Sequence, residues 1–68
     1  MVDTNALRAA WVAKGLTQAD VAEKLHITQK TMSSKMKKGV FGSDEIEQMI
    51  EMLSIENPIA IFFAKGVT

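Results

Sequence analysis

The chain has 68 residues, with eight basic and eight acidic side chains and no cysteine. This length allows a single small domain, and the lack of cysteine excludes disulfides and thiolate metal sites. The longest strongly apolar run covers residues 59–64, far fewer than the ~20 residues that cross a bilayer, and the N-terminus lacks the apolar run of a secretory signal, so we expect a cytoplasmic protein with no membrane partner.

The first helix is predicted to follow Thr4, a residue type that caps helices through its hydroxyl. Gly15 predicts the end of this helix, because glycine adopts the left-handed conformation that stops many helices. Leu7, Ala10 and Trp11 share one face at helical spacing, which predicts the side that packs into the core.

A second helix is predicted over residues 18–25. Thr17 precedes it and Asp20 comes three residues later, an arrangement close to a capping box. Its apolar face consists of Val21, Ala22 and Leu25. His26 then breaks the pattern, and a lone histidine without cysteine is interpreted as an exposed turn residue rather than a metal ligand or a pH switch.

Thr28 is predicted to cap a third helix over residues 29–38, which ends at Gly39. Met32 and Met36 are the only strongly apolar residues of this helix, and they lie about one turn apart. A helix with so narrow an apolar stripe contacts the core along one line and exposes the rest of its surface.

Ser43 is predicted to cap a fourth helix over residues 44–53. Its apolar face consists of Ile46, Met49, Ile50 and Leu53. Asn57 and Pro58 predict the start of a short fifth helix over residues 58–64, since asparagine is a favoured cap and proline a favoured first residue. No segment alternates between apolar and polar residues, so we predict an all-α fold in a single domain that spans all 68 residues.

Charge is distributed unevenly although it sums to zero. Residues 16–40 carry five lysines and two carboxylates, whereas residues 41–68 carry one lysine and five carboxylates. The basic middle is expected to face a polyanion. The acidic fourth helix is interpreted as a solvated face rather than a metal site.

Residues 17–38 contain two short helices joined by about three residues, and the second is polar and basic outside its methionine stripe. A DNA major groove admits such a helix, while the first helix braces it so that its side chains reach base edges. The sequences LTQADVAEKL at 16–25 and ITQKTMS at 27–33 resemble the helix-turn-helix of the Cro/C1-type (XRE-like) phage repressors. The resemblance implies a five-helix lambda-repressor-like DNA-binding domain and extends over nearly the whole chain.

The resemblance also implies roles for individual residues. Gln18, at the start of the second helix, and Thr28, which caps the third, are implied to contact phosphates. The side chains implied to read base edges are Gln29, Lys30, Ser33 and Ser34. The lysines implied to contact phosphates are Lys35, Lys37 and Lys38. No cofactor and no metal are expected.

Two positions depart from the pattern of this family. Many relatives have glycine where this chain has His26, so the turn is expected to be shaped differently. Some relatives pair a buried arginine with a glutamate at the positions of Trp11 and Met36. An apolar contact is expected here in place of that ion pair.

The predicted fifth helix is apolar at nearly every position. Ile59, Phe62 and Phe63 are predicted to form its buried face, which leaves Ile61 outside it. An apolar surface on more than one side predicts a homodimer interface formed by Ile59, Ile61, Phe62 and Phe63. The alternative is a fully buried helix in a monomer.

These inferences together predict a Cro-like transcriptional regulator that binds a pseudo-palindromic double-stranded DNA operator as a dimer. A second hypothesis is a protein-binding module of the same fold, an anti-repressor or co-repressor that acts on another phage regulatory protein. The zero net charge and the apolar C-terminal segment favour this second hypothesis to some extent. An antitoxin is a third hypothesis. No catalytic constellation is found, so the chain is not expected to be an enzyme.

Overall fold

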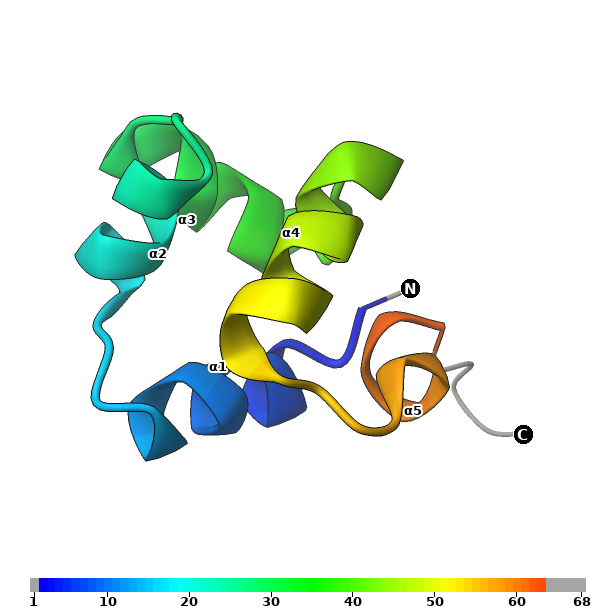
Figure 1. The fold of residues 1–68 in the computed structure, drawn as a ribbon. Helices are drawn as coiled ribbons and strands as arrows, with labels where there is room; N and C mark the ends of the chain where they lie inside the picture. Colours follow the sequence, from blue (N-terminus) through cyan, green and yellow to red (C-terminus); the bar gives the residue numbers. More distant parts are fainter. Residues whose placement is uncertain (1, 64–68) are drawn as a thin grey trace.

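The computed structural model describes residues 2–63, and within this range the chain forms five helices and no strand. The helices are α1 (Thr4–Ala13), α2 (Gln18–Lys24), α3 (Gln29–Lys38), α4 (Ser43–Leu53) and α5 (Pro58–Phe62). Figure 1 shows α2 and α3 together at one end of the molecule and α1 and α5 at the other, with α4 between them. The predicted all-α class is therefore confirmed. None of the helices in residues 2–63 combines the length and the apolar character needed to span a membrane.

A single apolar core joins all five helices. It is formed by Val2, Leu7, Trp11, Val21, Ala22, Leu25, Met32, Met36, Phe41, Met49, Leu53 and Phe62. The predicted apolar faces of the second and third helices are buried, and Ile46 and Ile50 of α4 are half-buried against this core. Trp11 and Met36 both belong to this apolar core.

Two helices begin one residue earlier than the sequence predicted. Asp3, not Thr4, caps α1, and its carboxylate accepts the Ala6 N–H at 3.1 Å. Gly42, not Ser43, caps α4, because the Glu45 side chain reaches back to accept the Gly42 N–H at 2.8 Å. In both cases a carboxylate accepts a backbone N–H at the start of the helix, where a hydroxyl was predicted to do so.

The buried face of α5 differs from the prediction. Phe62 is 2% exposed and Ile61 is half-buried, whereas Ile59 and Phe63 are 67% and 56% exposed. Pro58 is also half-buried, and residues 58, 61 and 62 follow the i, i+3, i+4 spacing of one helix face. The prediction that Ile59 and Phe63 are buried is therefore wrong. The predicted continuation of this helix to Ala64 lies outside the described residues.

The N-terminal residues connect the end of α3 to α5. The Val2 N–H donates to the Gly39 carbonyl at 3.0 Å, and the Asp3 N–H donates to the Ile61 carbonyl at 2.6 Å. Val2 is itself buried in the core. This segment therefore fixes the C-terminal end of α3 relative to the rest of the domain.

The turn between α2 and α3 has His26 in the left-handed conformation, with φ = 61°. The His26 N–H donates to the Glu23 carbonyl and the Ile27 N–H to the Ala22 carbonyl, each at 3.0 Å. These two bonds define a Schellman motif, whose left-handed position is usually glycine. The end of α1 has the same pattern with Gly15 at φ = 76°. His26 therefore adopts at the end of α2 the conformation that glycine adopts at Gly15.

His26→Gly is expected to raise the free energy of unfolding by about 0.5–1 kcal/mol, since relief of left-handed strain exceeds the entropic cost of glycine. Gly15→Ala is the reciprocal control. No atom lies within 4 Å of an added Cβ at Gly15, so only the backbone conformation opposes the methyl group. We expect this change to destabilise the domain by about 1 kcal/mol. Urea unfolding measures both variants, and a destabilised His26→Gly variant would contradict the account.

Candidate nucleic-acid interface

The N-terminus of α2 is fixed by a complete capping box. The Asp20 N–H donates to the Thr17 hydroxyl oxygen at 3.1 Å, and the Thr17 N–H donates to the Asp20 carboxylate at 2.9 Å. Hydrogen bonds from the Thr17 backbone N–H and side chain lower the pKa of Asp20 below its usual range. The predicted capping box is therefore confirmed, and it holds Gln18 at the first position of the helix.

The N-terminus of α3 is fixed in a similar way by Thr28. Its hydroxyl oxygen accepts the Thr31 N–H at 3.1 Å and lies 3.0 Å from the Thr31 hydroxyl oxygen. The predicted cap and the predicted bounds of this helix are confirmed, including its end at Gly39. Gln29 and Lys30 are exposed directly after the cap, in the first turn of α3.

The outer face of α3 is basic and polar. Met32 and Met36 point into the core, and at about 100° per residue the opposite side of the helix lies near Ser34. Within about 60° of this direction lie, besides Thr31, four exposed residues: Lys30, Ser34, Lys37 and Lys38. We call these four residues the lysine face. It brings together two predicted base-reading residues and two predicted phosphate-contacting lysines.

Gln18 and Ser33 link α2 to α3 through their side chains. The Gln18 amide nitrogen donates to the Ser33 hydroxyl oxygen at 2.8 Å, which joins a predicted phosphate contact to a predicted base-reading residue. The carboxamide oxygen and the second amide hydrogen of Gln18 are not used by this bond. The bond therefore holds the exposed sides of the two helices in a fixed relation.

Lys35 lies on the flank of α3 that faces α4, away from the lysine face. Its ammonium is 3.1 Å from the Glu45 carboxylate, and the two side chains are 30% and 16% exposed. The same carboxylate oxygen also accepts the Gly42 N–H. The expectation that Lys35 contacts phosphate is not supported, because its charge is already paired within the domain. Lys35 and Glu45 are ten residues apart, on either side of a loop, and this spacing does not indicate an ion pair. Glu45 was therefore not identified from the sequence as a residue that positions α3.

Charges of opposite sign lie on different helices, α3 and α4. All charged residues of α3 are lysines, four in number, and all charged residues of α4 are carboxylates, also four in number. The Lys35–Glu45 pair joins one charge from each helix. Lys30, Lys37 and Lys38 remain exposed on α3, whereas Asp44, Glu47 and Glu51 remain exposed on α4. Within residues 2–63 no three potential metal-ligating side chains gather in one place.

Comparisons of the chain with protein-family models, with curated proteins and with solved structures find no match. A function is therefore inferred from the geometry of α2 and α3 and from the charges that these helices carry. Of the predicted site residues, Gln18 and Ser33 are joined by a hydrogen bond, and Gln29 and Lys30 are exposed in the first turn of α3. Ser34, Lys37 and Lys38 continue the same exposed surface along α3.

Proposed function

We propose that the chain is a lambda-repressor-like helix-turn-helix domain and that it binds double-stranded DNA as a Cro-like transcriptional repressor. In this proposal α3 is the recognition helix and α2 braces it across the phosphate backbone. The observation that carries the proposal is the lysine face of α3, which lies opposite the two buried methionines. It gives a rigidly mounted helix an outward surface with the charge and width that suit a major groove about 12 Å wide.

Each side chain on this surface has a role that follows from its position. Gln29 and Lys30 lie in the first turn of α3, where side chains reach base edges, and glutamine and lysine pair with adenine and guanine respectively. Lys37 and Lys38, near the other end, are assigned to phosphates. Gln18 is assigned to a phosphate at the N-terminus of α2.

The zero net charge does not oppose this function, because the charges lie on different helices. The three exposed carboxylates of α4 repel phosphates, whereas the three exposed lysines of α3 attract them. The resulting field orients the recognition helix toward DNA. Repression follows from occupation of a promoter, and the proposal includes no catalytic step.

A homodimer is part of the proposal, since a pseudo-palindromic operator presents two half-sites about 34 Å apart. The residues assigned to the interface are Ile59 and Phe63, which are exposed, with Ile61 beside them. Phe62 is removed from the predicted interface, because it is buried in the core of one chain.

A protein-binding module of the same fold is the second candidate function. It is favoured by four exposed large apolar side chains, those of Val12, Val40, Ile59 and Phe63. A protein complex held by such contacts depends weakly on salt, whereas binding to phosphates weakens by orders of magnitude as salt rises. Salt dependence therefore separates the two functions.

Lys37→Gln is expected to weaken binding to all duplex sequences alike and to lower the salt slope by about 0.9, the value for one lost phosphate contact. Lys35→Gln is the matched control, since it removes the same charge from the same helix. We expect it to leave the salt slope unchanged because Lys35 is paired with Glu45. Fluorescence anisotropy at several salt concentrations measures both variants. Equal slopes for the two variants would contradict the assignment of the lysine face.

Gln29→Ala is expected to cost about 1–3 kcal/mol at a cognate site and to relax the base preference at one position. Its affinity for unrelated duplex DNA is expected to stay at the wild-type value, because no phosphate contact is lost. Competition binding with operators that differ at single positions measures this change. If operator affinity stayed the same, Gln29 would not read a base.

Phe63→Asp is expected to shift the monomer–dimer equilibrium toward the monomer by about tenfold or more, since it places a charge in an apolar interface. The control is Val12→Asp, which changes an exposed apolar residue on a different helix, α1. We expect it to leave the monomer–dimer equilibrium unchanged. Light scattering over a concentration series measures the mass of each variant. A wild-type chain that stays monomeric well above micromolar concentrations would remove the dimer from the proposal.

A further inference from the structure

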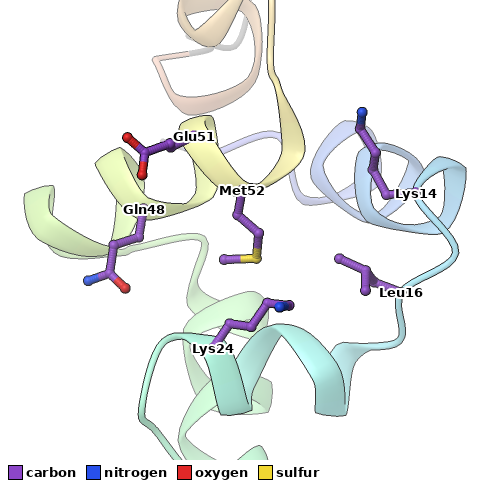
Figure 2. Close-up of a pocket in the computed structure, with 6 residues that line it drawn as sticks. All are labelled: Lys14, Leu16, Lys24, Gln48, Glu51 and Met52. Atoms are coloured by element: carbon purple, nitrogen blue, oxygen red, sulfur yellow. The ribbon is translucent and has the colours of Figure 1, made fainter.

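A hollow of about 660 Å³ lies between α2 and α4, beside the end of α1 (Figure 2). It is lined by Lys14, Leu16, Lys24, Gln48, Glu51 and Met52. These residues come from the end of α1, the following loop, the last position of α2 and the middle of α4. A volume of this size falls within the range of about 300–1,000 Å³ that small-molecule sites occupy.

The floor of the hollow is apolar and its open side carries positive charge. Leu16 and Met52 are half-buried and pack against the core with part of their surface. Figure 2 shows both side chains pointing into the hollow, with Lys24 extending beneath Met52. The Lys14 ammonium and the Glu51 carboxylate both point away from this space (Figure 2). Lys24 is therefore the charged residue that lies beside the two apolar side chains.

Neither lysine is neutralised by an ion pair within the part of the chain that the structure describes. The salt bridge found there joins Lys35 to Glu45, on a different surface. Asp20, one turn before Lys24, has its carboxylate bonded to the Thr17 N–H. Hydrogen bonds from Thr17 lower the pKa of Asp20 more than the charge of Lys24 does. Lys24 thus places an ammonium group directly against apolar surface, a combination that suits an anion with an apolar body.

We propose that this hollow binds a small aromatic carboxylate. The carboxylate is assigned to the ammonium of Lys24. The aromatic body is assigned to the space between Leu16 and Met52, because a thioether sulfur makes favourable contacts with aromatic rings. A ligand in this position bridges α2 and α4. The inference does not depend on DNA binding, and it is tested without DNA.

The test uses three indole compounds that differ in charge and share one aromatic body: indole-3-acetate, the neutral indole-3-ethanol and the cationic tryptamine. Methyl and amide NMR spectra of the full chain are recorded during each titration. We expect indole-3-acetate to give saturable shifts at the Leu16 and Met52 methyl groups and at the Lys24 amide. Tryptamine is expected to bind about fivefold more weakly or worse.

Lys24→Gln supplies the matched variant, because Lys24 is exposed and its replacement does not disturb the core. We expect it to weaken the binding of indole-3-acetate about two- to fivefold, whereas Lys37→Gln, an exposed lysine of α3, leaves the affinity unchanged. Three results would each overturn the proposal. They are equal affinities for indole-3-acetate and tryptamine, an unchanged affinity in Lys24→Gln, and no saturable shift at Leu16 and Met52 up to about 10 mM ligand.

Discussion

The burial of Met32 and Met36 is the constraint on which the rest of the structure depends. These two side chains are the only strongly apolar groups of α3, so the helix contacts the core along one line. Full burial of a methionine side chain contributes about 1.5–3 kcal/mol, which is enough to hold a short polar helix against the domain. Because the contact is so narrow, the remaining surface of α3 faces outward, and this surface carries the exposed lysines.

A helix held along one line can rotate or tilt unless other contacts fix it, and four such contacts are present. Thr28 caps its N-terminus, the Gln18–Ser33 bond ties one flank to α2, and the Lys35–Glu45 pair ties the other flank to α4. The bond from Val2 to the Gly39 carbonyl fixes its C-terminal end. An exposed hydrogen bond or ion pair is individually worth about 1 kcal/mol or less. Together these contacts restrain the rotation and tilt of α3, because they act on different sides of the helix.

The features that the sequence predicted correctly are those set by local chemistry. The Thr17–Asp20 capping box, the Thr28 cap and the methionine stripe each depend on residues within one or two turns, and all three are present. Two errors are also local, since Asp3 and Gly42, rather than Thr4 and Ser43, cap α1 and α4. The other errors concern contacts between distant segments. Which apolar side of α5 is buried depends on how the preceding loop presents the helix to the core, so Phe62 is buried where Phe63 is exposed. The pairing of Lys35 with Glu45 depends on the path of the loop between two helices, and no spacing in the sequence reveals it.

The most direct test of the central claim is selection of binding sites from a random pool of duplex DNA at low and at physiological salt, followed by sequencing of the enriched fragments. The account predicts enrichment of an inverted repeat with half-sites about one helical turn apart, and an affinity that falls steeply as salt rises. Absence of enrichment at both salt concentrations, without a salt-dependent affinity for duplex DNA, would contradict the assignment of α3 as a recognition helix.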